Sequence, residues 1–385
     1  MPKIVLVHPF DPYHPDQGGG IRYMQNLLKI AMKRGYETIV IGIEKESHSS
    51  TEGGIRFIPL VNIQNYRLER IIPLWLFFLI KLYISIVFLD LPKDAIVISH
   101  RMDCLLAFVI FKNKNPKFLI SAAPGYYLRT KYPVFYRYFG WLYQLVETIC
   151  IKNTKCIFPT DFRTKSYYLK KYPKANITEP IPSPIDLELF RPIPRHLAKE
   201  KVGLPLHNQI LLFVGRMVEV KNLPILLDAF RKIEKFSDRI ILVLIGHGED
   251  YFKIKELADR TCRNTLFLGA ISPDQMPYYY SAANALVLCS KEEGSPTVVK
   301  EALACGIPVI STDVGDVNRI ISSPILGKIV ENDSDSLKEG ILSVLTFDEN
   351  IEQSNFRRKS VEKYNVEIIG ETLFEKINKS LLALE

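Results

Sequence analysis

Short continuous apolar runs alternate with segments of helical periodicity through the first part of the chain. Lys3–His8 and Thr38–Gly42 are predicted strands, and Ile21–Arg34 between them is a predicted helix that Gly35 ends. A fully apolar run is typical of a parallel strand that helices cover on both faces. The pattern therefore predicts a doubly wound α/β domain.

The same pattern begins again at residue 210. Ile210–Val214 and Arg239–Ile245 are predicted strands, with a predicted helix over Leu223–Ile233. Five prolines lie between the two patterns, and proline cannot pair within a central strand. These are Pro180, Pro182, Pro184, Pro192 and Pro194. The sequence therefore predicts two Rossmann-like domains, residues 1–190 and 191–365, joined by an extended linker.

One stretch is so apolar that a membrane-spanning helix has to be considered beside a purely globular fold. Ile71–Leu89 contains nineteen residues and a single charge, Lys81. Its length alone makes it a transmembrane candidate. Strand-like runs on both sides, together with Pro73 and Lys81, favour a buried or surface-lying helix of an α/β domain.

The charges are distributed unevenly along the chain. Residues 1–190 hold 25 basic and 15 acidic side chains, whereas residues 191–385 hold 25 and 27. The first domain is therefore expected to face something anionic. No nucleic-acid-binding module accompanies this charge, so we expect no nucleic-acid partner.

The cysteines indicate neither a metal site nor a disulfide framework. The six cysteines show no CxxC pair and no metal-ligand spacing. Cys289 and Cys305 lie in apolar contexts and are predicted to be buried free thiols, which suggests a reducing compartment. Because the first residues lack a signal-peptide pattern, we expect a cytoplasmic protein.

Two loops that follow predicted strands carry residues suited to phosphate. Gly18, Gly19 and Gly20 precede the first helix, where glycine permits close approach and helix N–H groups attract anions. A triple glycine is also typical of a plain flexible turn. In the second domain, Arg216 and Lys221 follow a strand and suit a diphosphate, although a single such cation is usually just solvated.

The segment 285–310 contains the most distinctive pattern. The strand Ala285–Cys289 runs into a loop, after which Ser295 is the predicted N-cap and Pro296 the first residue of a helix that Gly306 ends. The short helix suggests a phosphate held by the amides around Thr297 and Val298.

Two glutamates flank this helix start. Glu293 precedes it and Glu301 lies about two turns in, so both could face one ligand if the loop turns back. Glu292 is instead expected to be solvated.

With these motifs the sequence resembles the retaining nucleotide-sugar glycosyltransferases of the two-Rossmann-domain (GT-B) type, specifically glycosyltransferase family four. The matching segments are 18–20, 33–37, 181–186, 190–192, 214–216, 221–222, 245–248, Glu293 with Glu301, and 302–310. The resemblance implies two domains facing a central cleft. It also implies transfer from a nucleotide diphosphate sugar to a glycan or lipid-linked acceptor, as a step of cell-surface polysaccharide or glycolipid synthesis, without a cofactor.

The resemblance also implies roles for individual residues. Arg216 and Lys221 would hold the donor diphosphate and stabilise the leaving phosphate, Glu293 would contact the donor sugar, and Glu301 would bind the ribose. Further donor contacts would come from Gly19, Gly20, Gly215, Gly294, Ser295, Pro296, Thr297 and Val298. Because no DxD triplet is present, we expect metal independence. A last helix over Val366–Leu384, after a broken region near Asn355–Asn365, would return to the N-terminal domain.

Two positions depart from the family pattern. Ser121–Gly125 lacks the histidine that many relatives carry there, and His100 is either a partial substitute or a structural histidine. Asp316 replaces the second glycine of a common pair and is expected to alter the sugar-side loop. Two alternatives to a glycosyltransferase therefore stay open. One is a catalytically silent partner subunit, and the other is a nucleotide-sugar epimerase or hydrolase.

The predicted acceptor side is rich in aromatic and basic residues. His100, Tyr126 and Arg129 are candidate acceptor contacts, and more aromatic residues follow up to Glu147. Phe135, Phe139, Leu142 and Val146 share one helical face and are predicted to point into the core. The other aromatic residues suit either further core or a membrane interface, so we expect an enzyme that can lie on the inner face of a membrane.

Overall fold

The computed structural model describes residues 3–13, 19–45, 51–52, 54–65, 73–112, 114–121, 133–346 and 350–382. The chain divides into two units. Unit 1 comprises Met1–Pro182 and Val366–Glu385, and unit 2 comprises Ser183–Asn365. The division therefore falls within the proline-rich segment.

Unit 1 is built on a seven-stranded sheet, counted over the described residues. In sheet order its strands are β3 (Thr51–Glu52), β4 (Ile55–Asn62), β2 (Glu37–Glu44), β1 (Lys3–Val7), β5 (Ile96–Ser99), β6 (Lys117–Ser121) and β7 (Cys156–Pro159). Only the edge strand β3 pairs antiparallel. Chain order reverses between β1 and β5, which is the switch point of a doubly wound sheet.

Helices cover both faces of this sheet. They are α1 (Gly19–Lys33), α2 (Leu74–Ser85), α3 (Met102–Phe111), α5 (Pro133–Lys152), α6 (Phe162–Lys171) and α15 (Val366–Leu382), with the 3-10 helix η1 (Ile63–Asn65). Because strand residues alternate, Ile4 and Leu6 pack with α1 and α15, whereas Val5 and Val7 pack with α2, α3 and the end of α5.

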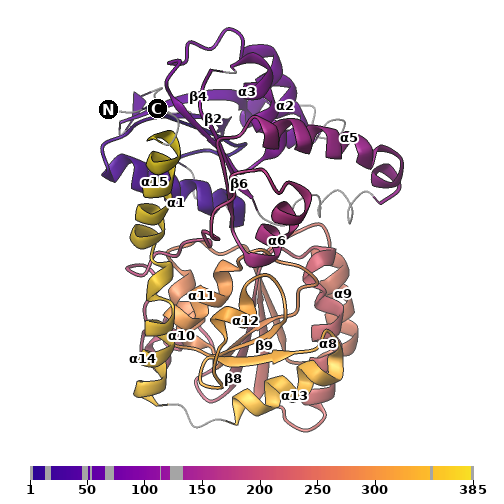
Figure 1. Cartoon of the computed structure of the whole chain (residues 1–385). Coiled ribbons are helices and arrows are strands. Elements are labelled where there is room, and N and C mark those ends of the chain that lie inside the picture. Colours follow the sequence, from indigo (N-terminus) through magenta and orange to yellow (C-terminus); the bar gives the residue numbers. More distant parts are fainter. Residues whose placement is uncertain are drawn as a thin grey trace. The chain divides into compact units, whose positions relative to one another are not determined.

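The last helix, α15, lies beside α1 in unit 1 (Figure 1). Gly370 allows this approach because a Cβ there would overlap the side chain of Ile30. Lys33 forms an ion pair with Glu367, and the ring of Phe374 stacks on Tyr36 with centroids 4.9 Å apart. These contacts make the end of the chain part of the N-terminal unit's core.

In the described part of unit 2, the sheet has six strands, all of them parallel. In sheet order the strands are β10 (Thr265–Gly269), β9 (Ile240–Ile245), β8 (Gln209–Val214), β11 (Ala285–Leu288), β12 (Val309–Thr312) and β13 (Gly327–Val330). Two doubly wound, Rossmann-like units confirm the predicted fold class.

The helices of unit 2 again cover both faces of its sheet. They are α7 (Arg195–Val202), α8 (Leu223–Glu234), α9 (Tyr251–Thr261), α10 (Met276–Ala282), α11 (Thr297–Ala304), α12 (Val317–Ile320), α13 (Ser334–Leu345) and α14 (Ile351–Ser360), with 3-10 helices η2 (Glu219–Lys221) and η3 (Glu362–Tyr364). Ile210 and Leu212 pack with α10 and α11, whereas Leu211 and Phe213 pack with α8, α9 and α13.

The predicted broken region near Asn355–Asn365 is wrong in its first half. α14 continues to Ser360, and η3 follows it. The helix is polar and buries only Arg357, so its sequence has little apolar periodicity. Asn350 and Gln353 form a capping box that starts it.

The apolar stretch 71–89 contains a short helix that lies on the surface. α2 covers twelve residues of it, with Phe78, Leu79 and Leu82 buried. Among the described residues, no helix has the length and apolar character needed to cross a bilayer.

The predicted core face of α5 is wrong. Phe139 is 47% exposed and Leu142 is 43% exposed, whereas Glu147 on an adjacent side of the helix is fully buried. α5 is apolar on both sides, so periodicity alone did not identify the buried side. Phe135 lies among the residues whose side chains are not described.

All six cysteines of the chain are free and buried. This confirms the prediction for Cys289 and Cys305. Burial raises the pKa of the Cys289 thiol to about 12, which keeps it protonated at neutral pH.

Candidate active site

The candidate residues of unit 2 follow the carboxyl ends of two neighbouring strands. β8 ends at Val214 and leads to Gly215, Arg216 and η2, and β11 leads through Glu293 to α11. Because the strands are parallel, both loops lie at one edge of the sheet. Open α/β sheets bind their ligands at this edge.

An ion pair joins these two loops. Lys221 Nζ donates to Glu293 Oε1, and the two side chains are only 17% and 18% exposed. Ser290 Oγ donates to the same carboxylate oxygen at 2.8 Å. The Cys289 thiol donates to the backbone oxygen of Lys221 at 3.1 Å, which fixes the lysine's main chain. Two predicted catalytic residues, 72 positions apart in sequence, are thus brought together.

Gly215 of the first loop lies against this pair. A Cβ at Gly215 would lie 3.5 Å from Lys221 Cε, so the glycine backbone lies against the lysine side chain. Asn222 ends η2 with φ of 52°, a left-handed conformation that asparagine tolerates better than most residues. Arg216 is exposed.

The start of α11 differs from the prediction. Pro296 is the N-cap, the helix begins at Thr297, and no side chain caps it. Ser295 is therefore not the cap. Its Oγ instead donates to Asp316 Oδ2 at 2.7 Å and accepts from Ser183 N at 3.2 Å. Without a side-chain cap, the first N–H groups of α11 are suited to an anionic ligand.

A buried lysine supports this loop from inside. Lys300 is fully buried, and its Nζ donates to Ser183 O at 2.9 Å and to Ser295 Oγ. The same ammonium lies 3.9 Å from Asp316 Oδ2 and 4.6 Å from the Tyr364 ring centroid. Burial lowers the pKa of Lys300. Lys300 was not predicted as part of the site, although its place on a helix whose other buried residues, apart from Glu301, are apolar was a usable signal.

The Asp316 side chain turns inward, toward the loop of Gly294 and Ser295. It is 5% exposed, and its N–H donates to Gly294 O at 3.1 Å. Gly315 has φ of 55°, and a Cβ there would overlap the carbonyl of Gly294. Asp316 thus helps to hold the loop of Gly294 and Ser295 in one conformation.

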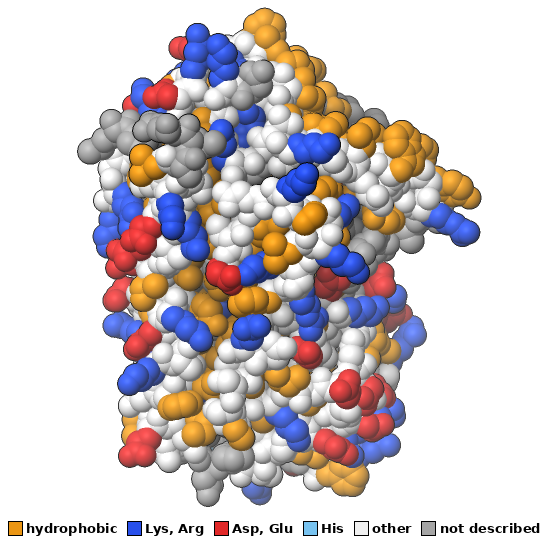
Figure 2. Space-filling view, viewed as in Figure 1, with side chains coloured by type: hydrophobic (Ala, Val, Ile, Leu, Met, Phe, Trp, Pro, Cys, Tyr) orange, Lys and Arg blue, Asp and Glu red, His pale blue; other side chains and the backbone are white. Residues whose placement is uncertain are grey.

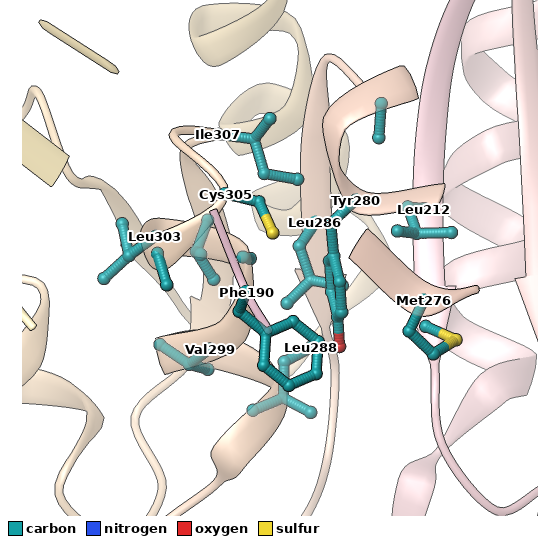
Figure 3. Close-up of a cluster of buried hydrophobic side chains, with 14 of the residues drawn as sticks. Phe190, Leu212, Met276, Tyr280, Leu286, Leu288, Val299, Leu303, Cys305 and Ile307 are labelled. Atoms are coloured by element: carbon teal, nitrogen blue, oxygen red, sulfur yellow. The ribbon is translucent and has the colours of Figure 1, made fainter. Parts of the chain in front are cut away.

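Glu301 lies deeper than Glu293. It is 2% exposed, and the Tyr280 hydroxyl donates to its Oε2 at 2.6 Å. Figure 3 shows the Tyr280 ring within the apolar cluster of unit 2, beside Phe190 and Leu286. The cluster fixes the tyrosine, so the tyrosine orients the Glu301 carboxylate. Tyr280 was not identified from the sequence.

Comparison with known proteins bears on this half of the chain. Residues 195–379, which include Arg216, Lys221, Glu293 and Glu301, match the sequence family described as glycosyl transferases group 1. This region belongs to the glycosyl transferases group 1 family.

Curated relatives match this chain over part of its length and of theirs. A putative teichuronic acid biosynthesis glycosyltransferase, TuaC, of Bacillus subtilis is 36% identical over 36% of this chain and 34% of its own. An alpha-monoglucosyldiacylglycerol synthase of Streptococcus pneumoniae is 32% identical over 43% of this chain and 39% of its own. The chain thus spans well under half the length of these relatives.

Solved structures share the fold along the whole chain. Sucrose-phosphate synthase from Thermosynechococcus elongatus has a TM-score of 0.81 and 21% identity, with full coverage of both chains. The GT-B fold is therefore established for the units on both sides of residue 183.

In unit 1, the predicted residues that the structure describes lie at the switch point. Gly19 and Gly20 begin α1, and His100 follows β5. A Cβ at Gly20 would lie 3.5 Å from the His100 ring. Burial lowers the pKa of His100 to about 4, so the imidazole is neutral at neutral pH.

His8 is a second histidine at this edge, and the sequence analysis did not select it. Its ring lies 6.3 Å from that of His100, edge to face. Burial lowers its pKa as well. Its place at the end of the first strand was the available signal.

The other predicted acceptor residues are not tested by the structure. Tyr126 and Arg129 lie outside the described residues. Within the described part of the chain, no group of three or more His, Cys, Asp or Glu side chains is placed to hold a metal ion.

Proposed function

We propose that this chain is a glycosyltransferase that takes a sugar from a nucleotide diphosphate sugar. The observation that carries the proposal is the Lys221–Glu293 pair beside the uncapped start of α11, inside the group 1 region. At this sheet edge, a cation and helix N–H groups suit the diphosphate of such a donor, and a carboxylate suits its sugar.

The proposed chemistry uses these groups in distinct ways. Loss of the nucleotide builds negative charge on the departing diphosphate, and fixed donors there lower the barrier. Lys221, Arg216 and the amides of Thr297 and Val298 supply these donors. Glu301, oriented by Tyr280, would accept hydrogen bonds from the ribose. No step in this scheme requires a metal.

Lys221 and Glu293 neutralise each other. A bound donor would replace both partners, with phosphate on Lys221 and a sugar hydroxyl on Glu293. We propose a retaining outcome, which needs either a carboxylate nucleophile or attack from the face that the leaving group shields. Glu293 is the candidate for the first of these routes.

We further propose a glycan or lipid-linked acceptor in cell-surface polysaccharide or glycolipid synthesis. The names of the relatives from Bacillus subtilis and Streptococcus pneumoniae support both acceptor types. His100, neutral and next to Gly20, is the candidate acceptor contact on unit 1.

The test is thermal stabilisation of the full chain by UDP-, GDP-, ADP- and CMP-sugars without added metal. One nucleotide class should stabilise the protein, by about 2.7 kcal/mol at a hundredfold excess over Kd. Lys221→Ala and Glu301→Ala should abolish the shift, whereas Lys232→Ala, a lysine in ion pairs elsewhere on α8, should keep it.

Transfer of labelled sugar to a glycolipid extract then tests catalysis. Lys221→Ala should lower the rate by about 10²–10³-fold, because one donor to the leaving group is lost. No stabilisation by any nucleotide sugar would indicate a silent partner subunit. Release of free sugar or of a new nucleotide sugar, equally fast without acceptor, would indicate a hydrolase or epimerase.

A further inference from the structure

Three neighbouring helices of unit 1 expose large apolar side chains on their outer sides. α3 packs against both α2 and α5, so the three form one layer over the sheet. Exposed residues of this layer include Ile84 at 61%, Ile110 at 54%, Tyr138 at 67% and Trp141 at 62%, and Phe88 just after α2 is 85% exposed. Figure 2 shows apolar side chains gathered over this part of unit 1, with Lys and Arg side chains close by. We call this surface the outer face.

The outer face is a second apolar side of these helices, distinct from the side that packs on the sheet. In α2, Ile80 and Ile84 are exposed at a spacing of four residues, while Phe78 and Leu82 on the opposite side are buried. A helix that is apolar on both sides is normally covered on both. Among the described residues, nothing covers the outer side of these helices. Exposed apolar patches of this kind mark interaction sites.

Charge on the same helices has one sign at the surface. Their two carboxylates are neutralised locally, since Asp103 pairs with Arg101 and the buried Glu147 pairs with Lys171. The exposed charges on α2 and α5 are the cations Lys81, Arg137 and Lys152. A second copy of the chain on this face would bring like charges together, whereas an anionic lipid surface would neutralise them.

We propose that the outer face of α2, α3 and α5 docks unit 1 onto an anionic lipid bilayer. Trp and Tyr beside aliphatic residues and cations are the composition of a helix layer that lies in the interfacial zone without crossing it. The inference deepens the proposed function and rests on it for its purpose, because a lipid-linked acceptor is met at such a surface.

The experiment is sedimentation of the full chain with vesicles of phosphatidylcholine alone, or of phosphatidylcholine mixed with phosphatidylglycerol. The wild-type chain should bind the mixed vesicles more tightly. The triple variant Ile84→Glu, Phe88→Glu, Trp141→Glu should bind both at least about tenfold more weakly, because it loses apolar insertion and adds like charge.

A second variant separates charge from insertion. Lys81→Gln, Arg137→Gln, Lys152→Gln should weaken binding to mixed vesicles by roughly a hundredfold and leave the weak binding to phosphatidylcholine unchanged. The matched control is Phe236→Glu, Phe252→Glu, which alters two side chains of unit 2 that are 80% and 75% exposed. It should bind as the wild type does.

Three results would overturn the docking proposal. These are wild-type protein that binds neither vesicle, a unit 2 control that loses as much binding as the triple variant, and a wild-type dimer without vesicle binding that the triple variant dissociates. The last result would assign the face to a second copy. Stabilisation by nucleotide sugars is measured on the same samples, so that the docking proposal and the proposed function can fail independently. Donor binding without vesicle binding would contradict docking alone.

Discussion

Helices cover the sheets of both units in similar layers, but the side chains on the outer sides of those helices differ between the units. On unit 2, α8 and α9 carry short-range ion pairs, such as Asp228 with Arg231 at 2.6 Å and Lys255 with Asp259 at 2.8 Å. On unit 1, the corresponding outer positions of α2 and α5 are apolar, as at Ile84 and Trp141.

Both layers nevertheless bury ordinary apolar side chains on their inner sides. A polar outer side is therefore sufficient for this architecture. The exposed apolar surface of unit 1 contributes little to folding, so its explanation lies in what the surface meets. Three measurements test this division between core and outer face.

The largest effect is expected inside unit 2. Lys300→Ala should lower the unfolding free energy of that unit by about 3 kcal/mol, because the buried carboxylate of Asp316 loses its cation. Hydrogen exchange in increasing urea should show the loss in α11 and not in unit 1. Lys328→Ala, at an exposed lysine, should change stability by less than about 0.5 kcal/mol. Equal effects of the two variants would contradict a supporting role for Lys300.

An intermediate effect is expected from acid on unit 1. The pKa of His100 falls from 6.5 to about 4 on folding, so the unfolded chain binds more protons between these values. The contribution of neutral His100 is complete above pH 6.5 and is lost as the pH falls to about 4, up to about 3 kcal/mol.

Some carboxylates of unit 2, such as Asp228 and Asp333, have lowered pKa values. Their contribution to the stability of unit 2 is lost only as the pH falls below 3.8, the ordinary pKa of aspartate. Unit 1 should therefore lose exchange protection first as the pH falls. His100→Asn should reduce the dependence of unit 1's stability on pH between 6.5 and 4. Simultaneous loss of protection in both units would contradict the assignment.

The smallest effects are expected on the outer sides themselves. Asp228→Asn should cost about 0.5–1 kcal/mol, because it breaks exposed pairs with Arg231 and Lys232. Ile84→Glu should change stability by no more than about 0.5 kcal/mol, since the side chain has no core contact to lose. Urea unfolding measures both, and a loss above about 2 kcal/mol for Ile84→Glu would place that residue in the core.

Much of the fold was predictable because parallel strands have a simple sequence pattern. The predicted strand Ile210–Val214 is β8 less its first residue, and Leu223–Ile233 is α8 less its last. These two predictions depend only on local periodicity. The placement of Lys221 and Glu293 at one site came instead from the family resemblance, and the ion pair between them was not predicted.

The errors arose where a residue had more than one suitable partner. Ser295 has the chemistry of an N-cap, but Asp316 and Lys300 take its hydroxyl, and neither is adjacent in sequence. Phe139 and Leu142 were assigned to the core because periodicity shows which residues share a helix face. It does not show which of two apolar faces meets the sheet.

The burial of all six cysteines has a practical consequence. Thiol-reactive dyes and spin labels attack exposed thiolates, so the folded wild-type chain should be nearly silent to them. A cysteine introduced at an exposed position of each unit would then carry the only labels. Pairs of such labels could report the spacing between the units, with and without a nucleotide sugar, without first removing any native cysteine.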